Sequence, residues 1–244
     1  MNSLHLNVKK ASNPVLAANY FFQGIKYLSR PGLRKFLLIP IFINLILYSA
    51  GFALGYYYIS GVIEQLIPEW LQWLNWILWP VFFISFFLIV FFSFTLLANL
   101  MAAPFYSKLS AHTLSLLTGK SVKIQEQQWP KVVWSEFRRL GYLGLRALPL
   151  VFISVIPGVN FIAPILWALF GAWAIALEYM AYPLENEGLL FYEQRQLARS
   201  MRFGALGFGG ITVAALTMPL LNIIVPPAAV IGATIYIQEM KDKH

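Results

Sequence analysis

The sequence predicts an all-α integral membrane protein, and its composition and charge distribution lead to this prediction. Charged residues make up 11% of the 244 residues and hydrophobic residues 59%, whereas soluble domains carry ~25% charged residues. Four tracts without a charged residue each exceed the ~18 residues of a membrane segment. They cover residues 36–63, 70–107, 147–177 and 203–238. We therefore expect one membrane domain over residues 1–244.

The composition also excludes several classes of function. The chain has no cysteine, which removes disulfides, thiol nucleophiles and Cys-ligated zinc. Neither a phosphate-binding glycine loop nor a His-Glu-x-x-His pair occurs, so we predict no enzyme, no catalytic residue, no metal site and no cofactor. The net charge of +8 would indicate nucleic acid for a soluble protein. In a membrane protein, Lys and Arg accumulate on cytoplasmic loops, so we predict membrane lipids and no nucleic acid as partners.

Residues 13–30 are expected to form an amphipathic helix. Ser12 or Asn13 can cap its start, Pro14 suits its first turn, and the apolar residues that follow recur at helical spacing. The helix could lie in the membrane interface or pack as a short core helix on the membrane domain. Pro31 and Gly32 end it.

Two long spanning helices are predicted next, over residues 33–63 and 76–118. The first would be roughly 45 Å long at 1.5 Å per residue, more than the ~30 Å hydrocarbon core. The second follows a cluster of tryptophans typical of a membrane surface. These are Trp70, Trp73, Trp76 and Trp79.

The last two tracts are interrupted at their middles and predict two re-entrant hairpins, over residues 141–182 and 203–240. Aligning the two tracts on their first prolines also aligns an asparagine and a second proline. The matched pairs are Pro157 with Pro219, Asn160 with Asn222, and Pro164 with Pro226. The limbs that they separate hold about 10–18 residues, or roughly 15–27 Å of helix, which is short for a ~30 Å core. Each hairpin should therefore enter and leave on the same side.

The positions of the basic residues support this topology. None of the 18 Lys and Arg residues lies at 64–69, the loop between the two spans. Two spans and two hairpins place all 18 on one side, which the positive-inside rule makes cytoplasmic. Both termini should then be cytoplasmic in a multi-pass protein.

Residues 30–35 are the candidate anion site. Pro31 and Gly32 break the chain before a long helix, whose N-terminal N–H groups attract negative charge. Gly32 permits close approach of an anion to the backbone, and Arg34 adds a planar fork that holds two oxygens of a tetrahedral oxyanion. Lys35 or Arg30 adds further positive charge. The alternative is a membrane anchor that contacts lipid phosphates.

Two segments, 31–40 (PGLRKFLLIP) and 99–105 (NLMAAPF), resemble the CysZ sulfate permease family of bacterial inner membranes. The resemblance extends in layout over nearly the whole chain. It implies sulfate uptake for cysteine biosynthesis, a homo-oligomer, and a sulfate site on Gly32, Leu33 and Arg34. Relatives often carry a second Arg where this chain has Lys35, which keeps the charge and loses the fork.

Other polar residues are open to two interpretations. Arg146 ends a second Gly-Leu-Arg, and it is either part of an anion path or an interfacial anchor. Asn160 and Asn222 either face that path or cap the half-helices. His112 is expected to be a surface or interfacial residue. We expect a solvated face at Glu185, Glu187 and Glu193.

The sequence thus predicts a passive or gradient-driven sulfate permease, an anion channel or carrier without enzymatic activity. The alternative from another class is a non-transporting membrane scaffold whose basic cytoplasmic face binds anionic lipid.

Overall fold

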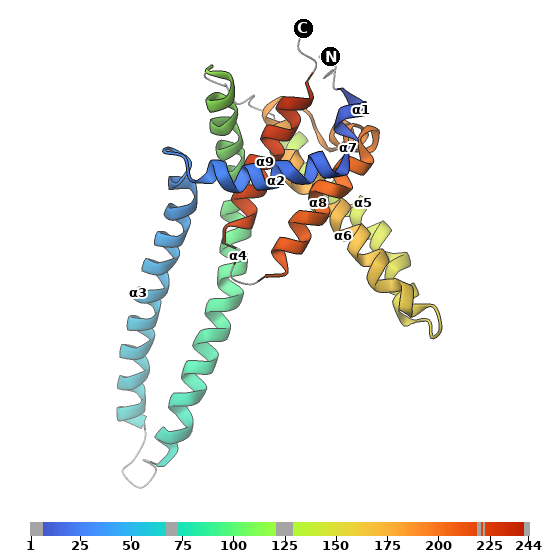
Figure 1. Ribbon diagram of the computed structural model, residues 1–244. Coiled ribbons are helices and arrows are strands. Elements are labelled where there is room, and N and C mark those ends of the chain that lie inside the picture. Colours follow the sequence, from blue (N-terminus) through green and yellow to red (C-terminus); the bar gives the residue numbers. More distant parts are fainter. Residues whose placement is uncertain (1–6, 67–72, 121–128, 219–220, 222, 242–244) are drawn as a thin grey trace. The chain divides into compact units, whose positions relative to one another are not determined.

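All the regular elements that the computed structural model describes are helices (Figure 1). It describes residues 7–66, 73–120, 129–218, 221 and 223–241. The helices are α1 (Val8–Ala11), α2 (Pro14–Leu28), α3 (Lys35–Leu66), α4 (Asn75–Thr118), α5 (Trp129–Val155), α6 (Ala163–Asn186), α7 (Phe191–Ser200), α8 (Arg202–Leu216) and α9 (Val225–Met240), with a 3-10 turn η2 (Asn160–Ile162) before α6. The all-helical prediction is confirmed.

The chain forms two compact units. The first combines Met1–Arg34 with Pro104–His244, and the second is Lys35–Ala103. The continuous helix α4 contributes residues to both units.

The second unit is an antiparallel pair made of α3 and the N-terminal part of α4. Aromatic rings join the two helices: Phe52 packs on Phe82 and Phe86 at centroid distances of 6.4 and 5.1 Å, and Tyr56 packs on Trp79 at 5.1 Å. At 1.5 Å per residue, the 32 residues of α3 measure about 48 Å, more than a ~30 Å hydrocarbon core requires. That both helices cross a membrane remains a prediction.

The core of the first unit surrounds α9, which is buried along nearly its whole length by α2, α6 and α8. Small residues let these helices approach closely. A Cβ on Gly24 of α2 would overlap the backbone of α9 at Ala228, and one on Gly209 of α8 would overlap the backbone of α6 at Ala172. Glycine is therefore required at both contacts, and close packing at small residues is also typical of helices in membrane proteins.

The helix α2 combines both interpretations offered by the sequence. Asn13 Oδ1 accepts hydrogen bonds from the N–H groups of Val15 and Leu16 at 3.0 and 3.1 Å, which confirms the N-cap. One face packs into the unit, whereas Val15 and Phe22 on the other face are 78% and 52% exposed. The helix is therefore a packed helix that still presents an apolar surface.

The first proline-broken tract forms the predicted hairpin, but with longer limbs than expected. The chain reverses at Pro157 and Gly158, where the φ of Gly158 is +83°, and α6 then begins with Pro164 in its first turn. The limbs α5 and α6 hold 27 and 24 residues, not 10–18. The prediction was wrong because the polar residues flanking the apolar tract continue both helices. The stretch Asn160–Asn186 is the one part of the described chain that is long and apolar enough to qualify as a membrane span.

The second hairpin has limbs of the predicted length, with 15 residues in α8 and 16 in α9. Pro226 and Pro227 lie in the first turn of α9, where their missing N–H groups cost nothing. Pro219 and Asn222 lie outside the described residues. That the hairpins re-enter the membrane remains a prediction.

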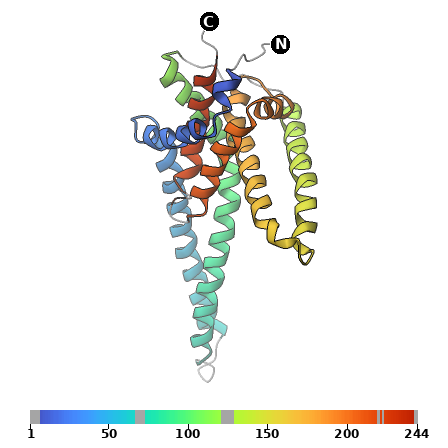
Figure 2. The same cartoon turned by 45° about the vertical axis from the view of Figure 1, so that its right-hand side comes forward.

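The two ends of the described chain lie together in the first unit (Figure 2). The N–H of Asn7 donates to the Met240 carbonyl at 2.8 Å. An ion pair between Lys241 and Glu187 joins the end of α9 to the end of α6. Both chain ends and the end of the first hairpin therefore gather at one end of this unit.

Candidate functional site

The candidate anion site lies in the turn formed by residues 31–34, hereafter the 31–34 turn. It follows α2, which ends at Leu28, and belongs to the first unit. Leu33 is fully buried and anchors the turn, and its N–H donates to the Arg30 carbonyl at 3.2 Å. That N–H is therefore used within the turn and does not contribute to an anion site.

Gly32 adopts a backbone conformation that favours glycine, with φ at +93°. A Cβ at this position would also lie 3.1 Å from Nε2 of His112 on α4. The half-buried His112 thus lies beside the turn, and was not recognised from the sequence because the two residues are far apart in the chain. The position requires glycine both for its φ and for the close approach of an imidazole.

Arg34 is exposed and held by one hydrogen bond, in which its Nε donates to the Ser29 carbonyl at 2.7 Å. The bond satisfies a carbonyl at the C-terminal end of α2, where positive charge is favourable. It fixes the guanidinium through Nε and leaves the two terminal nitrogens for another acceptor. The fork that the sequence predicted is therefore present on a tethered side chain.

The flanking basic residues have different surroundings. The Arg30 guanidinium stacks 3.7 Å from the centroid of the Tyr27 ring. Lys35 opens α3 in the second unit, and the first N–H groups of that helix have no intrahelical acceptor. The ion pairs of the described residues involve other cations, so no carboxylate neutralises Arg30, Arg34 or Lys35.

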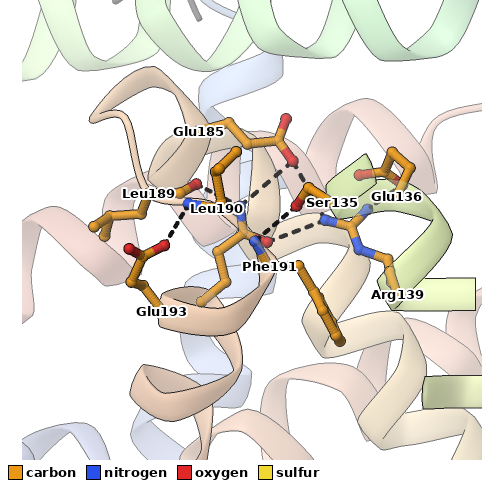
Figure 3. A network of polar contacts seen from close by, with 9 residues as sticks. Ser135, Glu136, Arg139, Glu185, Leu189, Leu190, Phe191 and Glu193 are labelled. Atoms are coloured by element: carbon orange, nitrogen blue, oxygen red, sulfur yellow. Dashed lines mark hydrogen bonds and ion pairs between the residues drawn. The ribbon is translucent and has the colours of Figure 1, made fainter. Parts of the chain in front are cut away.

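A second polar cluster, which sequence reasoning missed, surrounds Arg139 on α5 (Figure 3). Its terminal nitrogens donate to Glu136 at 3.1 Å, to Glu185 at 3.3 Å and to Gln194 at 3.1 Å. These contacts join α5 to α6 and α7, and 13% of the Arg139 side chain is exposed. Ser135 Oγ adds a further link by accepting from the Phe191 N–H at 2.9 Å. In the sequence, the one local signal for this cluster was the three-residue spacing of Glu136 and Arg139, which places opposite charges on one face of a helix.

The expectation of a solvated face at the acidic run was wrong for Glu185 and Glu187, whereas Glu193 is exposed as expected. Glu185 pairs with Arg139, and Glu187 pairs with Lys241. Glu193 accepts from the N–H of Leu190 at 2.8 Å and so caps the start of α7. Glu185 and Glu187 each stabilise a junction between elements, and a single sequence does not reveal partners so far along the chain.

The other candidate residues do not converge on the 31–34 turn. Arg146 is exposed and stacks on Tyr142, with its guanidinium carbon 4.6 Å from the ring centroid. Asn160 lies in η2 with its side chain exposed, and the cap position of α6 is Ile162. The predicted capping role of Asn160 was therefore wrong. Asn222 lies outside the described residues.

Comparison with known proteins decides the family. A family model described as "Sulfate transporter CysZ/Etoposide-induced protein 2.4" matches residues 20–227. This chain belongs to that family. The resemblance of the two short segments is thereby confirmed.

Several relatives in this CysZ family match nearly their full length. A "Sulfate transporter CysZ" of Pseudomonas aeruginosa (strain LESB58) is 39% identical over 227 residues, covering 89% of this chain and 92% of its own. One of Pseudomonas fluorescens (strain Pf0-1) is 39% identical over 234 residues, with 91% and 93% covered. One of Pseudomonas syringae pv. tomato is 37% identical over 227 residues, with 89% of each covered. The relatives are named as transporters, which agrees with the prediction that the chain is not an enzyme.

Proposed function

We propose that this chain is a sulfate permease of the bacterial inner membrane that supplies sulfate for cysteine biosynthesis. The observation that carries the proposal is the tethered Arg34 fork beside Gly32, which pairs with no carboxylate of the described residues, in a chain whose relatives are named sulfate transporters. The all-helical architecture and the apolar stretch Asn160–Asn186 agree with a membrane location.

The chemistry of the site suits a tetrahedral dianion. The terminal nitrogens of Arg34 can donate to two oxygens of one anion, and a charge-assisted pair of this kind is about twice as strong as a neutral hydrogen bond. Gly32 allows the backbone of the turn to adopt φ at +93°. Lys35, the next residue along the chain, adds a point charge.

Electrostatics sets the conditions for uptake. A negative-inside potential opposes the entry of a dianion by ~4.6 kcal/mol per 100 mV, and a low-dielectric interior adds a desolvation penalty. Uptake must therefore draw on cytoplasmic consumption of sulfate, on a coupled cation or on a transiently wide, hydrated route. Several copies of the chain, as the family resemblance implies, would supply the walls of such a route. Arg146, Asn160 and Asn222 are candidates for residues along it.

The proposal includes a multi-pass topology with both termini cytoplasmic. Its supports are the absence of Lys and Arg from residues 64–69 and the proximity of Asn7 to Met240 within the first unit. The length argument for re-entry now applies to the second hairpin alone, because both limbs of the first are long enough to cross a bilayer.

Competition binding tests the proposed specificity. Labelled sulfate bound to the purified protein should be displaced saturably by selenate, because selenate shares the tetrahedral geometry and charge. Equimolar chloride at constant ionic strength should displace little, since neither the fork nor the backbone N–H groups match a monatomic anion. If selenate and chloride displace sulfate equally, or if nothing displaces it saturably, the proposed site is wrong. Residues 30–35 would then be an anchor for lipid phosphates.

A further inference from the structure

We propose a second oxyanion-binding site, built by Arg146 of α5 and Arg195 of α7 around the ring of Tyr142. It is separate from the 31–34 turn and does not depend on the function assigned to that turn. Its ligand is a tetrahedral oxyanion, either the free dianion or the phosphate of a lipid headgroup.

The first observation is that two guanidinium groups converge on one aromatic ring. The guanidinium carbons of Arg146 and Arg195 lie 4.6 and 5.0 Å from the same Tyr142 centroid. The two carbons are therefore less than about 10 Å apart, and both cations lie against the same ring. A tetrahedral oxyanion at the edge of that ring could accept hydrogen bonds from both. The two residues are far apart in the sequence, so the fold brings two positive charges together.

The second observation is that the ring which both groups contact is itself held in place. Trp173 Nε1 on α6 donates to the Tyr142 hydroxyl at 3.1 Å, and Phe191 packs edge-on against the Tyr142 ring at 5.5 Å. The Tyr192 ring lies 5.8 Å from the Arg195 guanidinium carbon as well. Stacking on aromatic rings occupies the faces of a guanidinium and leaves the N–H groups at its edge to bind oxygens.

The third observation is that no acidic side chain neutralises this pair. In the described chain, Arg146 and Arg195 take part in no ion pair, and the Nε of Arg195 is buried without a hydrogen-bond partner. Arg139, about two turns before Arg146 on α5, differs in its terminal nitrogens. They are occupied by Glu136, Glu185 and Gln194, which gives it a role in joining helices, although its Nε is also buried without a partner. Two uncompensated cations held together are unfavourable unless an anion joins them.

The position of Arg146 on α5 suits either source of the oxyanion. An uncharged tract starts at the next residue and continues to the end of the helix, so Arg146 marks a boundary between its polar and apolar parts. A lipid phosphate lies at such a boundary in a bilayer. A free dianion attracted by the basic cytoplasmic loops would reach the same place from the aqueous side.

The site is tested by calorimetry on the purified protein in a maltoside detergent, which carries neither phosphate nor sulfate. All variants start from a parent protein that carries Arg34→Ala, which weakens anion binding at the 31–34 turn. One arm titrates sodium sulfate and the other short-chain phosphatidylglycerol, both at constant ionic strength. The test variant adds Arg146→Gln and Arg195→Gln. The matched control adds Arg138→Gln and Arg199→Gln, which remove the same charge from exposed positions on the same two helices.

The test variant should weaken binding at least about 10-fold in one arm, while the control stays within about two-fold of the parent. Loss in the sulfate arm assigns the site to the free dianion, and loss in the lipid arm assigns it to a headgroup phosphate. The proposal is overturned if the parent binds neither ligand, or if the test and control variants bind alike in both arms. If the double variant does not fold, Arg146→Gln alone, at an exposed side chain, makes the same comparison against Arg138→Gln.

The experiment separates this site from the proposed function. Arg34→Ala compared with the unmodified chain reports on the 31–34 turn, and the two double variants compared with each other report on the Tyr142 site. Either result can fail while the other holds.

Discussion

Replacing Arg34 is the sharpest test of the chemistry assigned to the 31–34 turn. The side chain makes one described hydrogen bond, from Nε to the Ser29 carbonyl, and offers its terminal nitrogens to the anion. Removing a hydrogen bond to a charged group costs about 1.5–3 kcal/mol, so Arg34→Ala should weaken sulfate binding roughly 10- to 150-fold. The loss of the Ser29 contact should lower stability by less, because Arg34 is exposed.

Arg34→Lys separates charge from geometry. Lysine keeps the positive charge but has neither a second coplanar donor nor an Nε to hold Ser29, so it should recover part of the lost affinity and not all of it. A purely electrostatic anchor would instead be restored fully. Lys26→Ala is the matched control, since it removes an exposed cation from the last turn of α2 without touching the 31–34 turn.

Isothermal titration calorimetry at constant ionic strength measures these affinities. The reasoning is refuted if Arg34→Ala binds sulfate as tightly as the unmodified chain, or if Lys26→Ala weakens it equally. Equal weakening would mean that overall positive charge, and not a defined site, determines binding.

Three further predictions concern the turn, the Arg139 cluster and the topology. Gly32→Ala should weaken sulfate binding about 5- to 30-fold in the same titration, because a residue with a Cβ in a left-handed backbone conformation costs ~1–2 kcal/mol. The control Gly141→Ala lies in open space on α5 and should leave the affinity unchanged. Arg139→Ala should destabilise the protein by about 3 kcal/mol in thermal unfolding, because it strands partly buried polar partners, whereas Arg138→Ala should cost under about 1 kcal/mol. Arg199→Cys, in a chain without native cysteine, should react with an impermeant thiol reagent only from the cytoplasmic side, and reaction from the periplasm would contradict the topology.

The sequence was sufficient for the elements whose signals are local. Three features depend only on the chemistry of the residues at that place in the chain. They are the cap at Asn13, the reversal at Pro157 and Gly158, and the proline in the first turn of α9 at Pro226. The lengths of α5 and α6 were underestimated because an apolar tract marks a solvent boundary and not a helix end. Polar residues with good helix propensity continue a helix past that boundary.

Contacts between distant residues could not be predicted in this way. Three such contacts depend on how separate helices pack. They are the approach of His112 to Gly32, the contacts of Arg139 with its partners, and the contact of Arg146 and Arg195 with one ring. Hydrophobic periodicity and turn residues specify elements, and they do not specify which faces meet. The candidate site at Gly32 and Arg34 could be proposed from the sequence because its residues lie in one short segment.

Uptake of labelled sulfate into liposomes that contain the purified protein tests the central claim most directly. We expect uptake that saturates with sulfate concentration, that selenate inhibits, and that Arg34→Ala reduces while Lys26→Ala does not. Liposomes with the protein that accumulate no more sulfate than empty liposomes, or an Arg34→Ala protein that transports at the full rate, would contradict the account.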